Sequence, residues 1–351
     1  MQAKIQNRNC IYLKFNIMKA FILEKYGKKQ ILSMANLPEP SLKPSEVLVE
    51  IHGTAINSLD ALIRNGEFKL FLPYKTPFVL GHDFAGTVIK VGGNVKGFQI
   101  GDKVYARPSD FNIGTFAEQI AVNEKDLAKV PSNIYMEEAA GIPLVGLTSW
   151  QALIEIANVQ PGQKVFIQAG SGGVGTFAIQ LAKHLGAFVA TTTSSANIDL
   201  VRSLGADEVI DYKKDDFSAK LKDFDVVLHS NKDVKVLERS LTILKPGGIL
   251  ISLTGPATAS LAQQFRLAFP FKLILNLLSN SVRRKANKLK VNYHFLFMKA
   301  DGVALADITK LIEEGKIKPI VDRIFDFDQV NEAIAYVETG KSKGKVIVKI
   351  K

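Results

Sequence analysis

The chain has 351 residues, of which 47% are hydrophobic and 23% charged, and its formal net charge is +11. This length and composition predict a soluble globular protein of about two domains. The single cysteine, Cys10, excludes an internal disulfide and a cysteine-rich zinc site. The excess of Lys and Arg fits a polyanionic cofactor, RNA or a membrane surface, and it also fits the background of a basic proteome.

Residues 1–17 contain three basic residues between short apolar stretches, a pattern that does not match a secretion signal. We predict a disordered extension there and a cytoplasmic protein. The apolar segment 261–278 is interrupted by Arg266, Pro270 and Lys272, so it is too broken to span a membrane. A buried helix pair, a dimer surface or a lid over a pocket is expected instead.

The N-terminal part of the chain, residues 18–130, reads as a β-rich domain. Apolar runs rich in β-branched residues predict strands at 47–51, 85–91 and 102–106, and Gly and Pro turns separate them. The C-terminal run 346–350 alternates like a half-exposed strand. We expect that last strand to pack back on the N-terminal domain.

After about residue 131 the pattern changes to alternating helices and strands, which predicts a parallel sheet covered by helices. The predicted strands are 164–168, 187–192, 208–210, 225–228, 248–253 and 323–327, and the predicted helices are 148–157, 173–185, 198–204, 303–314 and 328–338.

A glycine turn lies between the predicted strand 164–168 and the predicted helix 173–185. It matches G-x-G-x-x-G and contains Gly170, Ser171, Gly172, Gly173 and Val174. Glycines let the backbone approach a pyrophosphate closely, and the N–H groups of the first helical turn face the anion. In this strand–turn–helix context the motif predicts dinucleotide binding by a Rossmann domain. The alternative is a tight turn that binds nothing.

The end of the next strand indicates which dinucleotide is bound. NAD-binding chains place an Asp or Glu about 20 residues after the turn, to hold the ribose 2′-hydroxyl. Here the strand ends in a run of hydroxyls, and no carboxylate occurs before Asp199. We read Thr193 and Ser194 as contacts to a 2′-phosphate, which predicts NADPH as the cofactor. An ordinary loop is the alternative interpretation of these hydroxyls.

Several blocks in order resemble the medium-chain dehydrogenase/reductase superfamily, and more narrowly its zinc-independent quinone oxidoreductase and alkenal/enone reductase branch. The blocks are Ala55–Asp60, Arg64–Gly66, Gly81–Val88, Gly97–Val104, Gly146–Trp150, the glycine turn, Leu204–Tyr212, Leu244–Gly248 and Gly340–Val346. The resemblance implies an α/β enzyme with two domains: a GroES-like β-rich catalytic domain at 18–135 and 284–351, and a doubly wound, NADPH-binding Rossmann domain at 136–283. A homodimer is also implied.

The resemblance makes a catalytic metal unexpected. Zinc members of the superfamily have a Cys where this chain has Asn57, a His at His82, and a later Cys or Asp near Pro143. A catalytic zinc needs three protein ligands, and only His82 matches, although Asp60 and Asp83 stay open as oxygen ligands. Without zinc nothing strongly polarises an alcohol, which argues against alcohol oxidation.

The resemblance also implies roles for single residues. Asn57 and Thr148 would hydrogen-bond the nicotinamide ribose or carboxamide, with Leu253 and Gly255 along the carboxamide side and Tyr212 at the adenosine end. Relatives often carry a basic residue where this chain has Ala196 or Asn197, so Arg202, Lys341 or Lys343 would have to meet the 2′-phosphate. Leu62, Phe295 and Phe297 are candidates for the substrate pocket, and Arg64 is a candidate to orient an oxyanion.

The expected function is hydride transfer from NADPH to a quinone or to the C=C bond of an α,β-unsaturated carbonyl, without metal. The cofactor supplies the hydride, so the protein has to supply position and a few donors. The alternatives are a zinc-type alcohol dehydrogenase relative, an RNA-binding reductase homologue and an NADPH sensor with little catalysis. The chain has no recognisable RNA-binding module, so the expected partner is a small-molecule substrate and not a nucleic acid.

Overall fold

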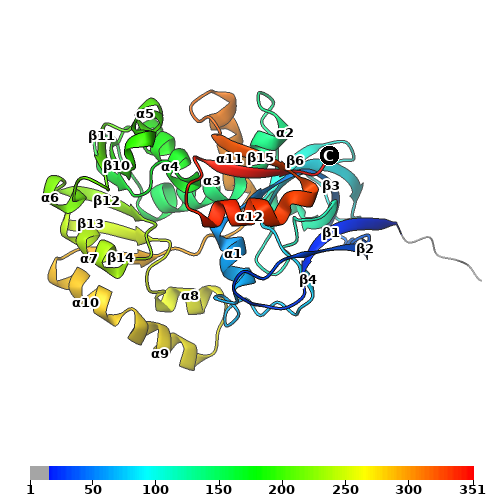
Figure 1. The fold of residues 1–351 in the computed structure, drawn as a ribbon, viewed down its shortest axis with the longest axis horizontal. Coiled ribbons are helices and arrows are strands. Elements are labelled where there is room, and N and C mark those ends of the chain that lie inside the picture. The colour runs from blue at the N-terminus through cyan, green and yellow to red at the C-terminus, as the bar shows by residue number, and fades with distance from the viewer. Residues whose placement is uncertain (1–15) are drawn as a thin grey trace, which may run out of the picture.

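The computed structural model describes residues 16–351, which form two lobes and contain three sheets (Figure 1). Residues 1–15, which make up most of the predicted extension, lie outside the described part, and Ile17 already opens the first strand. In the described part no helix is long and apolar enough to cross a membrane.

One lobe is β-rich, as predicted. A small antiparallel sheet has the order β2-β1-β4, and a 7-stranded sheet has the order β15-β16-β3-β5-β6-β8, with β7 pairing with β3. The strands are β1 (Ile17–Leu23), β2 (Ser33–Pro38), β3 (Glu46–Ile56), β4 (Phe78–Val79), β5 (Asp83–Val91), β6 (Lys103–Ala106), β7 (Gln119–Asn123), β8 (Leu127–Lys129), β15 (Val321–Asp326) and β16 (Lys345–Lys349).

The C-terminal strand β16 pairs antiparallel with β3, which confirms that the chain end packs back on the N-terminal domain. The half-exposed character predicted for it is wrong, because Val346, Ile347 and Val348 are all buried. Helices α2 (Met136–Ala140) and α12 (Val330–Glu338) both contact β16, so neither side of the strand faces water.

The other lobe contains a six-stranded sheet in the order β11-β10-β9-β12-β13-β14, and every pairing in it is parallel. The strands are β9 (Lys164–Ile167), β10 (Phe188–Thr193), β11 (Glu208–Asp211), β12 (Phe224–His229), β13 (Leu244–Ser252) and β14 (Asn292–Phe295). Numbered along the chain this is the order 3-2-1-4-5-6 of dinucleotide-binding domains. Ligands of such sheets bind at the carboxyl ends of the strands, where the order reverses between β9 and β12.

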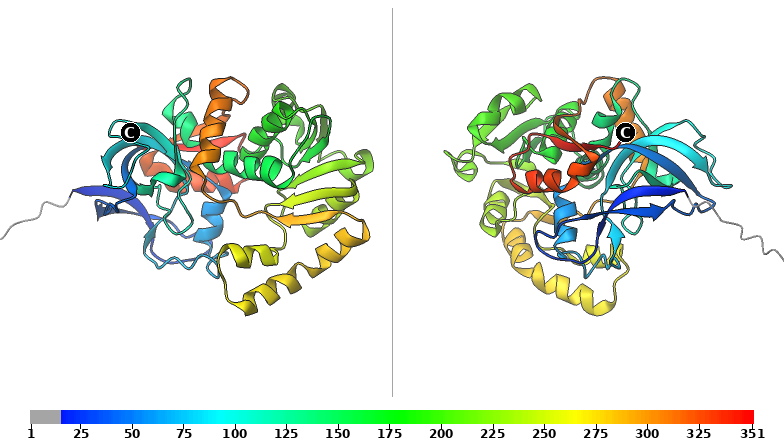
Figure 2. Two further views of the ribbon diagram at one scale, coloured as in Figure 1. Left: turned by 180° about the vertical axis from the view of Figure 1, so that it is seen from behind. Right: turned by 45° about the vertical axis from the view of Figure 1, so that its right-hand side comes forward.

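Neighbouring residues of β9 face opposite sides of the sheet, which explains its continuous apolar sequence. Val165 and Ile167 belong to a core shared with α3 (Pro143–Trp150), α4 (Gly173–His184) and α11 (Gly302–Glu313). Phe166 faces the opposite core. Helices covering that second side are α6 (Phe217–Lys220), α7 (Val234–Thr242) and α10 (Asn280–Lys288), while α5 (Ile198–Ser203) contacts β10 and β11 (Figure 2).

Two sequence-based boundaries differ from the structure. The helix predicted at 148–157 begins earlier, with Pro143 at its first position, and continues after Trp150 as a π-helix over Gln151–Ile156. Proline is favoured there because it needs no N–H partner at a helix start. The predicted return to the β-rich domain at residue 284 falls inside α10. Strand β14 still pairs with β13, so the return follows Phe295.

The apolar segment 261–278 forms α8 (Ala259–Gln264) and α9 (Phe269–Leu278). Leu261 and Ala262 of α8 are buried, whereas α9 buries only Leu275 fully. The predicted buried helix pair is therefore wrong for α9, which lies at the outer edge of the molecule (Figure 1).

Candidate cofactor and substrate cleft

The glycine turn connects β9 to α4. Two of its glycines are packed so closely that a side chain there would clash with neighbouring atoms. A Cβ on Gly170 would lie 2.2 Å from Thr191 Oγ1, and a Cβ on Gly175 would lie 2.3 Å from the Ala169 carbonyl oxygen. Gly172 differs, because a Cβ there would meet nothing closer than 3.4 Å. Only glycine therefore permits the close approach of α4 to β9, and open space remains in front of Gly172.

The N-terminus of α4 fits an anionic group. Gly172 is its N-cap, no side chain caps the helix, and the first turn contains no acidic residue. Unpaired N–H groups at a helix N-terminus bind phosphate groups, assisted by the helix dipole. The residues predicted from the motif, Gly170 to Val174, thus form a cradle into which a pyrophosphate fits.

The C-terminal part of the chain reaches this turn from the other lobe. The Gly344 N–H donates to the Ser171 carbonyl oxygen at 2.9 Å, and Gly344 forms an isolated parallel bridge with Gly172. Gly344 has a φ of +81°, and a Cβ there would lie 2.2 Å from the Ile320 carbonyl oxygen, so glycine is required. Lys341 and Lys343 are exposed in the loop that precedes this contact. The structure therefore brings both lysines near the glycine turn.

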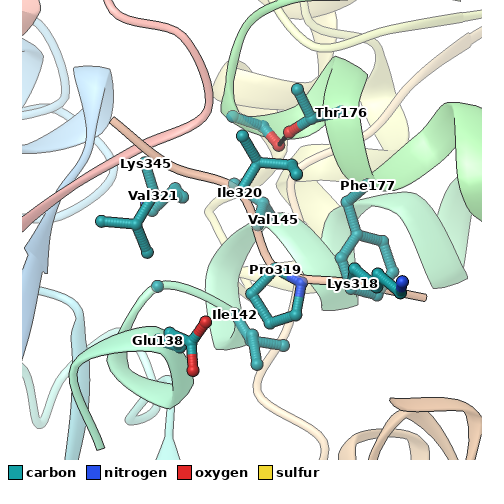
Figure 3. Close-up of a pocket in the computed structure, with 12 residues that line it drawn as sticks. Glu138, Ile142, Val145, Thr176, Phe177, Lys318, Pro319, Ile320, Val321 and Lys345 are labelled. Carbon is teal, nitrogen blue, oxygen red and sulfur yellow. Dashed lines mark hydrogen bonds between the residues drawn. The ribbon is translucent and has the colours of Figure 1, made fainter. Parts of the chain in front are cut away.

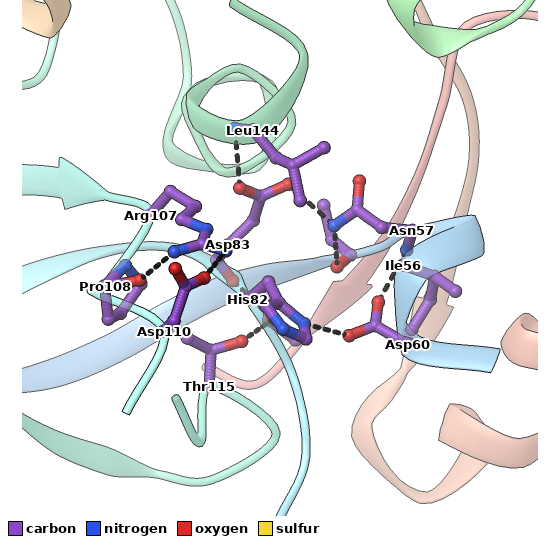
Figure 4. A network of polar contacts seen from close by, with 12 residues as sticks. Ile56, Asn57, Asp60, His82, Asp83, Arg107, Pro108, Asp110, Thr115 and Leu144 are labelled. Carbon is purple, nitrogen blue, oxygen red and sulfur yellow. Dashed lines mark hydrogen bonds and ion pairs between the residues drawn. The ribbon is translucent and has the colours of Figure 1, made fainter. Parts of the chain in front are cut away.

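Lys345, which sequence reasoning missed, begins β16 and joins the buried polar network around Asn57 and Asp83, two residues that Figure 4 shows. Its Nζ donates to Asn57 Oδ1 at 2.5 Å and lies 3.3 Å from Asp83 Oδ2. The Asn57 amide donates to Asp83 Oδ2 at 2.9 Å, and the Leu144 N–H donates to Asp83 Oδ1 at 2.8 Å. Burial raises the pKa of Asp83, and the ammonium of Lys345, the Asn57 amide and the Leu144 N–H counter that effect. The network joins β3, β5, β16 and α3.

The only zinc-type position that the sequence retains, His82, is engaged by a carboxylate. His82 Nδ1 lies 2.6 Å from Asp60 Oδ1, and the other oxygen of Asp60 accepts the Asn57 N–H at 2.7 Å. Both side chains are fully buried. Within residues 16–351 no group of three or more His, Cys, Asp or Glu residues could hold a metal ion.

The side chains of two further predicted site residues, Arg64 and Thr148, form hydrogen bonds within the protein. Arg64 NH2 lies 2.6 Å from Glu338 Oε1 of α12, and its Nε and NH2 donate to Asn65 Oδ1. An oxyanion role for Arg64 would require that ion pair to open, so the geometry favours a role in joining α1 (Ser58–Arg64) to α12. Thr148 donates its hydroxyl to the Leu144 carbonyl at 2.7 Å and keeps its lone pairs for a donor on a ligand.

At the adenosine end, the predicted hydroxyls lie beside the glycine turn. Thr193 Oγ1 donates to Ser171 Oγ at 3.0 Å, and the Asn197 amide donates to Ser171 Oγ at 3.1 Å and to Ser194 Oγ at 3.5 Å. Tyr212 is 59% exposed beyond the end of β11. Arg202 is exposed on α5.

Sequence reasoning overlooked Asp211, which ends β11 directly opposite Thr193. Its carboxylate accepts hydrogen bonds from the Ser195 hydroxyl and from the Lys213 N–H, and these donors lower its pKa. Lys214 Nζ lies 3.8 Å from the same carboxylate. An acidic group therefore does lie at this edge of the sheet, but it comes from the neighbouring strand and is paired. The Val209-Ile210-Asp211 strand end was the available signal.

A cavity of about 250 Å³ lies at the carboxyl ends of β12 and β13. His229, Asn231, Leu237, Thr254 and Gly255 are among the residues that line it. His229 Nδ1 lies 2.9 Å from Ser252 Oγ, which also accepts the Gly255 N–H at 2.8 Å. The Leu253 N–H donates to the His229 carbonyl at 2.9 Å. The predicted residue Gly255 thus lines this cavity together with the unpredicted His229, and Leu253 is bonded through its backbone to His229.

The His229 imidazole should make stability fall in mild acid. Burial lowers the pKa of His229 to about 4 from its ordinary 6.5, so the unfolded chain binds the proton more tightly. Between pH 6.5 and 4 the folded state should lose about 3 kcal/mol of unfolding free energy through this group. Urea titrations of His229→Gln across this range should lack that loss, whereas the exposed control His184→Gln should retain it. Parallel curves for all three proteins would contradict the assignment.

Phe297 and Phe295 take different places. The Phe297 ring lies 5.5 Å from the ring of Phe68, which follows α1, and 5.4 Å from the ring of Phe265, which follows α8, so it bridges the two lobes. Phe295 packs in a cluster with Leu261 and Leu275. The substrate-wall hypothesis therefore fits Phe297 better than Phe295. Leu62 is partly exposed in α1.

A second pocket, lined by Val145, Gly173, Phe177, Ile320 and Lys345 among others, lies between α3, α4 and the chain before β15 (Figure 3). Its volume of about 10 Å³ holds about one water molecule. This small space lies beside Lys345 and Gly173.

A doubly wound parallel sheet, a cradle for a pyrophosphate and a β-rich lobe that meets it define a two-domain nicotinamide-dependent oxidoreductase. Residues 43–132 match the family described as "Alcohol dehydrogenase GroES-like domain", and residues 204–348 match the family described as "Zinc-binding dehydrogenase". The chain belongs to the medium-chain dehydrogenase/reductase superfamily, in its zinc-independent quinone oxidoreductase and alkenal/enone reductase branch.

Individual relatives agree over nearly the whole chain. It is 35% identical to the 2-methylene-furan-3-one reductase of Solanum lycopersicum, over 94% of this chain and 79% of that protein. It is 34% identical to the chloroplastic NADPH-dependent alkenal/one oxidoreductase of Arabidopsis thaliana, with the same two shares. The solved quinone oxidoreductase of Coxiella burnetii superposes with a TM-score of 0.84 at 28% identity, covering 96% of this chain and 100% of that one.

Proposed function

We propose that the protein transfers hydride from NADPH to a quinone or to the C=C bond of an α,β-unsaturated carbonyl, without metal. The proposal rests on the glycine turn at the N-terminus of α4, which no side chain caps. Gly344 and the polar network of Lys345, from the other lobe, lie next to this turn. The names of the tomato, Arabidopsis and Coxiella proteins support the substrate classes and NADPH.

The position of each residue indicates which part of the cofactor it would contact. The backbone from Gly170 to Val174 would hold the pyrophosphate, and Thr193, Ser194 and Tyr212 would meet the adenosine end. Asn57 has both amide hydrogens bonded, to Asp83 and to the Ala55 carbonyl, so its remaining Oδ1 lone pair is left for a donor on the nicotinamide side. The bound cofactor supplies the hydride, and the protein holds it against the acceptor and excludes water.

The proposal predicts NADPH oxidation with short enones or quinones in the presence of a zinc chelator. Relative to NADH, NADPH should have a kcat/KM at least about tenfold higher, a transition-state difference of about 1.4 kcal/mol. Ser194→Asp should remove this preference, because a carboxylate at the strand end repels a 2′-phosphate and can hold a ribose 2′-hydroxyl.

The outcomes separate the alternatives. Loss of turnover on chelation, with stoichiometric zinc in the purified protein, would favour a zinc-type alcohol dehydrogenase. Binding of NADPH without turnover of any acceptor in the panel would favour a sensor. Retention on RNA with no turnover would favour an RNA-binding homologue. A preference for NADH would overturn the cofactor assignment.

We also propose a homodimer and a cytoplasmic location. Strand β14 ends the parallel sheet of the described residues and offers one free edge for a second copy. Sedimentation velocity tests the first proposal, and a monomer at micromolar concentration would contradict it. Imaging of the tagged full chain tests the second; the Arabidopsis relative is named as chloroplastic.

A further inference from the structure

Helix α9 exposes an apolar surface that no other described element covers. The exposed fractions are 77% for Phe269, 54% for Leu273, 47% for Ile274, 65% for Leu277 and 63% for Leu278. These residues fall into two adjacent i, i+4 rows on one side of the helix. Contiguous apolar surface of this kind on a soluble fold marks an interaction site.

Helix α10 continues α9 with little change of direction and places its cations on the same side. The Arg283 N–H donates to the Ser279 carbonyl, so the helical bonding runs across the junction. The buried residues Leu275, Ser279, Val282 and Ala286 follow one another at spacings of four, three and four, which is a single helical stripe. Leu273, Leu277, Arg284 and Lys288 lie at helical spacing on the opposite, exposed side.

The positive charge of the chain is concentrated in this region. Residues 239–300 contain ten Lys and Arg residues and no Asp or Glu, so nearly all of the net charge of +11 comes from this segment. On α10, Arg283, Arg284 and Lys288 are exposed, and only Lys285 pairs with an acid, Glu238 of α7, at 2.8 Å. Arg239 and Lys245 of the segment also pair with acids, Asp216 and Asp225, so the exposed positive charge next to α9 is that of Arg283, Arg284 and Lys288.

We propose that α9 and α10 form a docking surface for an anionic lipid bilayer, with the apolar rows of α9 in the acyl boundary and the cations of α10 at the headgroups. An interfacial helix binds membranes through such a combination of buried apolar area and attraction to anionic lipids. A second copy on this face would bring two like-charged surfaces together. Single-stranded RNA prefers aromatic stacking platforms, whereas α9 exposes mainly aliphatic side chains.

Docking would bring the cleft between the lobes close to the membrane. Leu275 of α9 packs in the same cluster as Leu261 of α8 and Phe295, and Phe297 lies against that cluster. This consequence rests on the proposed function: a lipophilic quinone or alkenal dissolved in the bilayer would reach the substrate wall directly. Membrane binding itself does not depend on catalysis.

The test is co-sedimentation of the full chain with vesicles of phosphatidylcholine, alone or mixed with phosphatidylserine, at low and high ionic strength. Binding should require the anionic lipid and weaken with salt. Leu273→Ser with Leu277→Ser should reduce binding at least about tenfold. Arg284→Gln with Lys288→Gln should reduce it about 30-fold. The matched controls, Ile100→Ser with Ile324→Ser and Lys222→Gln with Lys316→Gln, alter equally exposed residues elsewhere and should bind like the parent.

Three outcomes would overturn the proposal. They are no sedimentation with phosphatidylserine vesicles, equal binding by the α9 variants and the controls, and conversion of a dimer to a monomer by the α9 substitutions, which would make α9 a subunit interface. Sedimentation of parent and Leu-to-Ser proteins alike on a single-stranded RNA, with no vesicle binding, would assign the charge to nucleic acid. NADPH oxidation with a water-soluble acceptor should be unchanged in every variant, so a failed docking test and a failed function are distinguishable.

Discussion

Replacing Lys345 with methionine should destabilise the protein by about 3–5 kcal/mol, because the substitution leaves the buried Asp83 carboxylate without its cation. Asp83→Asn should be destabilising for the converse reason. The double variant should lose less than the sum of the two single variants, since it removes both charges together. Urea unfolding of the four proteins measures the coupling directly.

The matched control for this pair is Lys129 and Asp102. Their 3.2 Å separation equals that of the buried pair to within 0.1 Å, but the Lys129 side chain is 62% exposed. Lys129→Met should therefore change stability by less than about 1 kcal/mol. Additive losses in the double variant, or equal losses at both lysines, would show that Lys345 acts through packing alone.

Gly172→Ala should abolish most NADPH binding while leaving the fold intact. Gly172 has an ordinary φ of −80°, and an added Cβ would meet no protein atom closer than 3.4 Å, so the methyl projects into the space in front of the cradle. We expect the Kd for NADPH to rise at least about tenfold, equivalent to about 1.4 kcal/mol. Calorimetry measures the Kd, and the thermal shift that NADPH gives the parent should nearly vanish.

Gly175→Ala should behave differently. Its Cβ would lie 2.3 Å from the Ala169 carbonyl and 2.6 Å from Gly170 Cα, so backbone has to move and stability should fall by about 3 kcal/mol even without cofactor. Gly97→Ala, where the nearest atom lies 3.7 Å away on a side chain, is the neutral control. Unchanged NADPH affinity in Gly172→Ala would remove the glycine turn as the cofactor site.

Local sequence patterns were enough to predict the strand and the glycine turn of the cofactor-binding lobe. Val165, Phe166 and Ile167 had to be a strand buried on both faces, and the glycines after them needed close backbone approach, so the turn was readable within a dozen residues. The burial of the C-terminal strand was harder to predict. The alternation in 346–350 predicted one exposed face, but α2 and α12 cover both sides of β16.

The polar contacts of the cleft were beyond sequence reasoning because their partners are far apart in the chain. Lys345 meets residues 288 and 262 positions away at Asn57 and Asp83, and Arg64 meets Glu338 274 positions away. Asp211 faces Thr193 only because parallel strands β10 and β11 align their carboxyl ends. No spacing rule connects such residues before the sheet order is known.

By itself the sequence determined the strand–glycine turn–helix unit, the parallel sheet around it and the loss of the zinc ligand set, since each depends on residues close together or on the residue types present. Only the tertiary structure decided that Arg64 is paired, that Lys345 orders Asn57 and Asp83, and that α9 faces outward. Those outcomes depend on which distant segments share a buried volume, and burial sets whether a charge is paired and whether an apolar row is covered.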